Sequence, residues 1–154
     1  MNIEVVTGDL LQQDVDVIVN SWNRNIIPWW LLILQGVAAA IKKQAGNEPF
    51  KEVARYGSIP LGEARITSAG NLPFKAIIHV AGINLFWMAS EYSVRQSVIN
   101  VMKIVNQQGY KSVAMPLIGS GAGTRGKQWS EKIILDTLAS IDSNARGVLV
   151  RFSK

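Results

Sequence analysis

Apolar residues along the chain form two kinds of pattern, short runs typical of buried strands and longer stretches with helical spacing. The short runs predict strands at residues 3–6, 15–20, 64–68, 76–80, 112–115 and 147–152. The helical spacing predicts four helices, three of which end just before a glycine, at residues 37–45, 48–56, 90–108 and 128–141. Strands that alternate with helices predict the α/β class, here a three-layer α/β/α sandwich around a central mixed, mostly parallel six-stranded sheet.

A glycine-rich stretch joins the strand at 112–115 to the helix that begins near Gln128. Glycine stands at positions 119, 121, 123 and 126, and a backbone without Cβ lets a ligand approach closely. Free N–H groups and the helix dipole at a helix start favour phosphate or diphosphate. We therefore expect an anionic, nucleotide-like ligand, and the alternative is a plain flexible turn.

Two better-known glycine motifs match parts of this loop. Gly121, Gly126 and Lys127 have the spacing of a P-loop, but Gln128 stands where Ser or Thr should bind magnesium. Glycines 121, 123 and 126 have the spacing of the dinucleotide fingerprint. Both motifs normally open a fold and precede several βα units, whereas only about thirty residues remain here, so both are disfavoured.

Length and composition predict one domain over residues 1–154, with 48% hydrophobic residues to form a core. The absence of cysteine excludes disulfides and Cys-based zinc sites. His79, the only histidine, lies in an apolar strand, where a buried and hydrogen-bonded histidine is expected rather than a base or ligand. No metal and no cofactor are expected.

The net charge of +5 comes from scattered basic residues, which indicates a solvated basic surface and does not favour nucleic acid as partner. No signal peptide is visible at the N-terminus, so a cytoplasmic protein is expected. The apolar segment 26–34, IIPWWLLIL, is too short for a membrane span. It is either a buried loop and helix start, or a ligand wall or partner surface, and the sequence leaves this open.

Five segments in chain order resemble the macrodomain family, bacterial type, whose fold binds ADP-ribose. They cover almost the whole chain: Gly8-Asp9-Leu10, residues 15–23 (VDVIVNSWN), Gly36-Val37 leading to Ala45-Gly46, residues 59–67 (IPLGEARIT) with 72–82 (LPFKAIIHVAG), and residues 112–123 (SVAMPLIGSGAG). Each segment alone is weak, but the ordered set is specific. The resemblance implies binding of ADP-ribose or of ADP-ribosylated macromolecules, with no membrane partner.

The resemblance also implies roles for single residues. Asp9 matches the acidic residue that accepts the adenine amino group, with Leu10 as the backbone contact beside it. Asn23 matches the second Asn of the family's N-A-A-N motif, which contacts the distal ribose, and Phe152 loosely matches an aromatic at the adenine edge. The two phosphate loops correspond to Gly36 with Val37, and to Ser120, Gly121, Ala122, Gly123 and the following Thr124.

Departures from the family pattern leave catalysis open. Ala38 stands where the hydrolytic branch has an acidic residue, and Trp22 replaces a small residue of N-A-A-N. Asn23 could orient the ribose or a water for hydrolysis of an ADP-ribosyl ester or O-acetyl-ADP-ribose, but an amide is not a base. Glu63, the nearest carboxylate in a motif, is expected to be structural. The alternatives are a non-catalytic ADP-ribose reader and an RNA or protein-interaction module.

Overall fold

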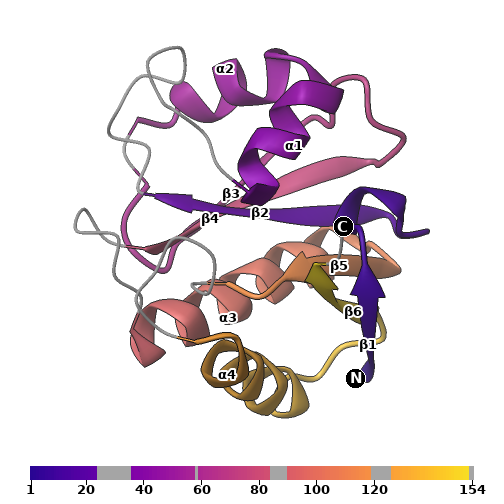
Figure 1. Ribbon diagram of the computed structural model, residues 1–154, viewed down its shortest axis with the longest axis vertical. Coiled ribbons are helices and arrows are strands. Elements are labelled where there is room, and N and C mark those ends of the chain that lie inside the picture. The colour runs from indigo at the N-terminus through magenta and orange to yellow at the C-terminus, as the bar shows by residue number, and fades with distance from the viewer. Residues whose placement is uncertain (24–35, 58, 84–89, 119–125, 153–154) are drawn as a thin grey trace.

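The computed structural model describes residues 1–23, 36–57, 59–83, 90–118 and 126–152 (Figure 1). The strands are β1 (Asn2–Gly8), β2 (Val17–Asn23), β3 (Ala64–Thr67), β4 (Ala76–Ile83), β5 (Ser112–Pro116) and β6 (Arg146–Phe152). The helices are α1 (Gly36–Ala45), α2 (Glu48–Ala54), α3 (Glu91–Gln108) and α4 (Lys127–Ala139), with a short 3₁₀ helix η1 (Leu10–Gln12) after β1. No helix in these ranges has the length and apolar content needed to cross a bilayer.

The six strands form one sheet in the order β1-β6-β5-β2-β4-β3. Every neighbouring pair is parallel except β3 and β4, which are antiparallel and joined by residues 68–75. The predicted mixed, mostly parallel sheet is therefore confirmed. The carboxyl ends of β1, β6, β5, β2 and β4 consequently lie along one edge, which we call the carboxyl edge, and their starts lie along the opposite, amino edge.

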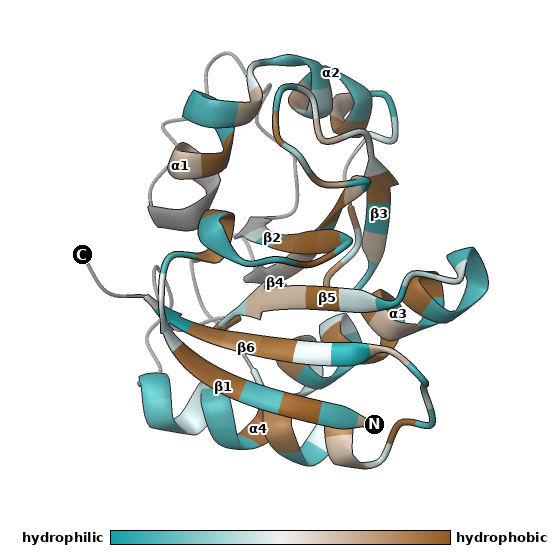
Figure 2. Ribbon diagram, turned by 90° about the vertical axis from the view of Figure 1, so that its right-hand side faces the viewer, coloured by the Kyte–Doolittle hydropathy of each residue, from teal (hydrophilic) through white to brown (hydrophobic). Residues whose placement is uncertain are grey.

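Helices cover both faces of the sheet, α1 and α2 on one face and α3 and α4 on the other (Figure 1). Each face has its own apolar core, and successive residues of β2 contribute to opposite cores because side chains alternate along a strand. Val17 and Val19 belong to the core beneath α3 and α4. Ile18 belongs to the core beneath α1 and α2, together with Ile41 of α1 and Phe50 of α2. In Figure 2 hydrophobic colouring runs along the central strands, as this double burial requires.

Helix α1 runs antiparallel to β2 because its last turn is fixed at the amino edge. The backbone N–H of Asn71, in the β3–β4 turn, donates to Ala45 O at 2.9 Å. A Cβ at Gly70, whose φ is 57°, would lie 2.2 Å from the same oxygen, so this close approach requires glycine. Since the end of α1 lies at the amino edge, its first residue, Gly36, is directed toward the carboxyl edge.

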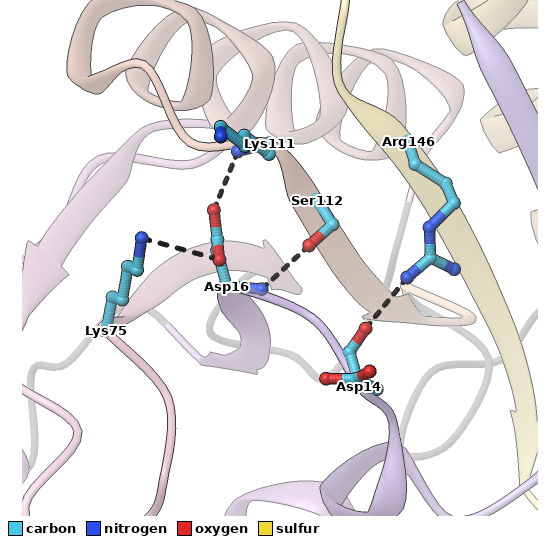
Figure 3. Close-up of polar contacts among 6 residues, drawn as sticks. All are labelled: Asp14, Asp16, Lys75, Lys111, Ser112 and Arg146. Carbon is cyan, nitrogen blue, oxygen red and sulfur yellow. Dashed lines mark hydrogen bonds and ion pairs between the residues drawn. The ribbon is translucent and has the colours of Figure 1, made fainter.

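The amino edge is tied together by polar contacts around Asp16, which we call the Asp16 clasp (Figure 3). Asp16 Oδ2 accepts from the Lys111 backbone N–H at 2.8 Å, and the Asp16 N–H donates to Ser112 Oγ at 2.8 Å. Lys75 Nζ lies 3.6 Å from Asp16 Oδ1. Next to this clasp, Arg146 Nη2 donates to Asp14 O at 2.8 Å. The beginnings of β2, β4, β5 and β6 are thereby linked.

Strands β2 and β4 differ most from the sequence prediction. We expected strands at 15–20 and 76–80, whereas β2 begins at Val17 and ends at Asn23, and β4 continues to Ile83. The β2–β4 ladder extends to the pair Asn23–Ile83 across a register shift. Pairing with a neighbouring strand thus holds polar residues in extended conformation, although the hydrophobic pattern has ended. The helix boundaries agree within two residues, and the predicted helix end at Gly109 is confirmed by its left-handed φ of 71°.

Candidate functional site

The connections that leave β2 and β5 make these neighbouring strands the switch point of the sheet. The chain leaves β2 for α1 on one face and leaves β5 for α4 on the other face (Figure 1). In open α/β sheets, ligands bind in the crevice outside the carboxyl ends of two such strands. Among the described residues, the β2–β5 ladder consists only of the pairs Val17–Val113 and Ile18–Ala114. The two strands are therefore unpaired toward the carboxyl edge, where a crevice is expected.

The corner of the carboxyl edge at β1 and β6 carries Asp9. Gly8 and Phe152 are register partners at the ends of these strands, and Asp9 follows Gly8 directly. Asp9 Oδ1 accepts from the Leu11 N–H at 2.9 Å and so caps η1. The other carboxylate oxygen, Oδ2, is paired with none of the described residues. It therefore remains an acceptor beside the end of the last strand.

The residues predicted to contact the adenine differ in how fully they are described. Leu10 is buried and its side chain belongs to the core beneath α1 and α2, so only its backbone can face a ligand. Phe152 ends β6, but its side chain lies outside the described part of the structure, as does that of Asn23 at the end of β2.

The first turn of α1 consists of the predicted phosphate-loop residues Gly36 and Val37. The first N–H groups of a helix have no partner within the helix, and they carry the positive end of its dipole. Because α1 runs toward the amino edge, these groups are at the carboxyl edge, on the side of β2 where the chain crosses over. The last turn carries Lys42 and Lys43, which complement the negative end of the dipole.

The structure describes only the residues on either side of the predicted second phosphate loop. Ser120, Gly121, Ala122, Gly123 and Thr124 lie outside the described residues, and so does the apolar segment 26–34. Immediately before this loop, Ile118 is buried, and its carbonyl oxygen accepts from Ser130 Oγ of α4 at 2.5 Å. Gly126, immediately after the loop, caps α4 in an extended conformation. Ser130 therefore closes the base of the loop at the start of α4.

These features follow one line along the carboxyl edge. Asp9 follows β1, the glycine loop follows β5, and Asn23 ends β2. The next helix along the chain from β2 is α1. From β1 to β2 there are three steps of about 4.8 Å, or roughly 14 Å across the sheet. An acceptor at one end, and the first N–H groups of α1 with an asparagine at the other end, suit an elongated ligand with a purine, a diphosphate and a sugar.

The buried histidine is confirmed as a core residue. His79 Nε2 lies 2.8 Å from Thr67 Oγ1, and Nδ1 lies 3.1 Å from Asn20 Nδ2. Complete burial lowers the pKa of His79 from 6.5 to about 3, so the imidazole is neutral at physiological pH. Asn20 itself was not singled out by the sequence analysis, although a polar residue within an apolar strand was a usable signal.

Glu63, just before β3, and Glu131 of α4 each form an ion pair with an arginine. Glu63 is exposed and lies 3.8 Å from Arg65 Nη1, in line with the structural role expected for it. Arg151 of β6 donates to both carboxylate oxygens of Glu131 at 2.7 and 3.0 Å, and these hydrogen bonds hold the pKa of Glu131 below its ordinary value. Within the described ranges, no group of three His, Cys, Asp or Glu residues could hold a metal ion.

Comparisons with known proteins agree with this geometry. A family model described as Macro domain matches residues 19–134. An O-acetyl-ADP-ribose deacetylase of Citrobacter koseri is 37% identical over an alignment of 145 residues, and the match covers 89% of this chain and 78% of that relative. A solved mutant macrodomain of Oceanobacillus iheyensis with ADPR has a TM-score of 0.86 and 26% identity, and the match covers 99% of this chain and 86% of that one. A Trypanosoma brucei macrodomain in complex with ADP-ribose has a TM-score of 0.81 at 19% identity over 97% and 63% of the two chains, a likeness of fold alone.

Proposed function

This chain belongs to the macrodomain family, and on that premise we propose that it binds ADP-ribose, either free or attached to another macromolecule. The observation that carries the proposal is the position of Asp9. Its Oδ2, which pairs with none of the described residues, lies at the β1–β6 corner, at one end of the row of strand ends that leads through β5 to β2 and the start of α1. Relatives named O-acetyl-ADP-ribose deacetylase and solved macrodomains with ADPR support the choice of ligand.

We assign the adenine to the Asp9 corner. Adenine N6 is a donor, and a carboxylate oxygen is an acceptor whose charge strengthens the hydrogen bond. The cap on η1 fixes the carboxylate by its Oδ1, so Oδ2 is held in one direction. The backbone of Leu10 and the ring of Phe152 would complete the purine site.

We assign the diphosphate to the amide groups of two loops. The N–H groups of Gly36 and Val37 open α1, and those of Ser120–Thr124 precede α4, so two helix starts contribute positive partial charge. Opposite sheet faces supply these two helices, which allows them to approach the diphosphate from both sides. No side-chain cation is needed for this mode of binding.

We assign the distal ribose to Asn23 at the end of β2. Hydrolysis there needs a positioned water and a base to activate it. Ala38 supplies no carboxylate and the amide of Asn23 has no useful basicity, so the substrate's own diphosphate is the remaining base. We therefore propose ADP-ribose binding as the primary function, with slow, substrate-assisted hydrolysis of an ADP-ribosyl ester or O-acetyl-ADP-ribose as a secondary activity.

Calorimetry with ADP-ribose tests the binding proposal. A dissociation constant in the micromolar range, with ADP weaker than ADP-ribose, is the expected result. No heat of binding at millimolar ADP-ribose would show that the proposal is wrong. RNA binding that depends on salt and is not competed by ADP-ribose would instead favour an interaction module.

Incubation with O-acetyl-ADP-ribose tests the hydrolytic proposal. Asn23→Ala should abolish turnover, whereas Ala38→Asp should raise it by restoring a carboxylate beside the ribose. Turnover that survives Asn23→Ala would remove the role assigned to Asn23. Binding without any turnover in the wild-type chain or in Ala38→Asp would leave a non-catalytic reader.

A further inference from the structure

A pocket lies at the amino edge of the sheet, at the opposite end of the strands from the proposed ADP-ribose site. We call it the amino-edge pocket. It has a volume of about 460 Å³ and is formed by the end of α3, the residues that lead into β5, and the connection from α4 to β6. This volume falls within the roughly 300–1,000 Å³ that is typical of small-molecule sites. A ligand bound here would not touch the carboxyl edge.

Asn106 of α3 fixes the walls of the amino-edge pocket. Its Nδ2 donates to Asp142 O at 3.2 Å, and its Oδ1 accepts from Ser143 Oγ at 2.6 Å. Ser143 Oγ also accepts from the Ala145 N–H at 3.1 Å. The α4–β6 connection is therefore held against the last turn of α3, so the pocket has its shape before a ligand binds.

The α3 side of the pocket is negative. Helix α3 has 18 residues and ends at Gly109, and its last turn contains no basic residue, whereas the last turn of α1 has two lysines. Asp142, whose backbone is bound to Asn106, adds a carboxylate that pairs with none of the residues that the structure describes. A carboxylate next to the negative end of a helix dipole is unfavourable, and a cation between the two would remove the repulsion.

Lys111 supplies positive charge on the β5 side of the pocket. The Asp16 clasp uses only the backbone N–H of Lys111 (Figure 3). The ammonium group forms no ion pair with any described carboxylate, including that of Asp142. One pocket thus has a carboxylate and an ammonium group that do not pair with each other, and a ligand with both charges would complement both.

The deeper part of the pocket is apolar. Val105 and Ala145 are buried, and Tyr110 is half-buried and packs against the core beneath α3 and α4. Asp142 and Lys111, by contrast, are exposed. An apolar side chain of a ligand can therefore lie against the floor while its charged groups stay at the rim.

We propose that the amino-edge pocket binds a zwitterionic α-amino acid with an apolar side chain. The ammonium group of the ligand lies between Asp142 and the end of α3, its carboxylate pairs with Lys111, and its side chain covers Val105 and Ala145. This inference does not depend on the proposed function, because the pocket contains none of the residues assigned to ADP-ribose.

An NMR titration of the amide signals with leucine tests the proposal, and two derivatives separate the charges of the ligand. N-acetyl-leucine lacks the ammonium group, and leucine methyl ester lacks the carboxylate. We expect leucine to shift the signals of Gly109 and Asn144, which line the pocket, with a dissociation constant of about 1 mM. Each derivative should bind the wild-type chain about three- to fivefold more weakly, since exposed ion pairs are weak.

Two variants remove the charges of the pocket one at a time. Asp142→Asn should weaken leucine binding about three- to fivefold and leave that of N-acetyl-leucine unchanged. Lys111→Met should weaken leucine binding by a similar factor and leave that of leucine methyl ester unchanged. Both positions are exposed, so both variants should fold. Asp136→Asn and Lys132→Met are the matched controls, because they remove exposed charges of α4 outside the pocket, and they should bind leucine as the wild-type chain does.

Several results would overturn the inference. One is the absence of shifts at Gly109 and Asn144 with leucine at about ten times the expected dissociation constant. Tighter binding of leucine methyl ester than of leucine would indicate a site for cations, and tighter binding of N-acetyl-leucine would indicate a site for anions. Equal affinity for all three compounds would show that the charges of the pocket do not select the ligand.

ADP-ribose keeps this test separate from that of the proposed function. Leucine should not displace ADP-ribose, since the two sites lie at opposite edges of the sheet, and displacement would contradict the assignment of leucine to the amino-edge pocket. Leucine binding in a chain that does not bind ADP-ribose would overturn the proposed function and support this inference.

Discussion

Gly8 and Phe152 are register partners in the parallel ladder of β1 and β6, although they stand near opposite ends of the sequence. Their pairing brings Asp9, the residue after Gly8, next to the end of the last strand. The two oxygens of the Asp9 carboxylate have different roles. Oδ1 caps η1 at 2.9 Å from the Leu11 nitrogen, and Oδ2 stays available to a ligand. One side chain thus has a structural and a proposed binding role, and substitutions can separate them.

Asp9→Asn should change the base preference of the protein with little loss of stability. The asparagine oxygen can still accept from Leu11 N–H, but an NH₂ group replaces Oδ2 and faces the adenine amino group, donor against donor. We expect ADP-ribose to bind at least about tenfold more weakly. The hypoxanthine analogue of ADP-ribose, which carries an acceptor at that position, should bind the variant better than the wild-type chain. Calorimetry with both ligands measures the exchange.

Asp9→Ala is the comparison for this variant. It removes the cap as well as the acceptor, so it should lower the free energy of unfolding by about 1 kcal/mol in addition to weakening ADP-ribose binding. Equal affinity of Asp9→Asn for both ligands would argue against adenine at this corner.

Ser130→Ala should loosen the glycine loop at its base. The hydroxyl of Ser130 is buried and donates to Ile118 O at 2.5 Å, so its removal leaves a buried carbonyl unpaired and costs about 1–2 kcal/mol of stability. We also expect a several-fold loss of ADP-ribose affinity, because ligand binding must then order the loop. Chemical denaturation and calorimetry measure the two effects.

Ser97→Ala is the matched control for the loop. Ser97 is completely buried and donates to Ser93 O at 2.6 Å within α3. It should lose similar stability and retain full affinity. Parallel losses of affinity in both variants would mean that stability alone controls binding.

The Asp16 clasp should affect stability without affecting ligand binding (Figure 3). Asp16→Ala removes the acceptor of the Lys111 N–H and should cost about 1–3 kcal/mol in the free energy of unfolding. Asp16→Asn retains an acceptor and loses only the ion pair with Lys75, whose side chain is 65% exposed, so it should cost less than about 1 kcal/mol. Neither change should alter ADP-ribose affinity, since the clasp lies at the amino edge. A loss of affinity in Asp16→Asn would contradict this separation.

The stability of the protein should fall with pH in a window set by His79. Burial lowers its pKa from 6.5 to about 3, so below pH 6.5 the unfolded chain binds a proton that the folded chain excludes. The stabilising contribution is therefore complete above pH 6.5 and is lost as the pH falls toward 3, by up to about 1.4 kcal/mol per unit. Urea denaturation between pH 7 and 5 measures this slope before carboxylates begin to titrate.

His79→Gln should be less stable at neutral pH and should lack the slope. No other histidine is present to replace it. A slope that persists in His79→Gln would have to come from other groups.

The elements of this fold could be predicted from the sequence because their determinants are local. Gly109 ends α3 by its own left-handed conformation, and Ser90 caps the same helix through Ser93, three residues away. The end of β2 could not be predicted, since Asn23 is extended through its pairing with Ile83 of another strand.

In the candidate site, too, some features could be predicted from the sequence and others could not. The resemblance of short motifs predicts Asp9 and the glycine loop as binding residues, because their residue types are themselves the pattern. Contacts between residues far apart in the sequence could not be predicted: Asn20 bonds His79 59 positions away, and Asp16 bonds Lys111 95 positions away. Hydrophobic periodicity contains no information about such pairs, which appear only after the sheet has formed.

The Asp16 clasp and the early end of the β2–β5 ladder lie at opposite edges of one sheet. The contacts that stabilise the sheet at its amino edge are therefore separate from the proposed ligand site. Substitutions at the carboxyl edge can therefore change the proposed ligand site while the contacts at the amino edge still hold the sheet together. New ligand specificities can thus arise by substitutions at the carboxyl edge alone.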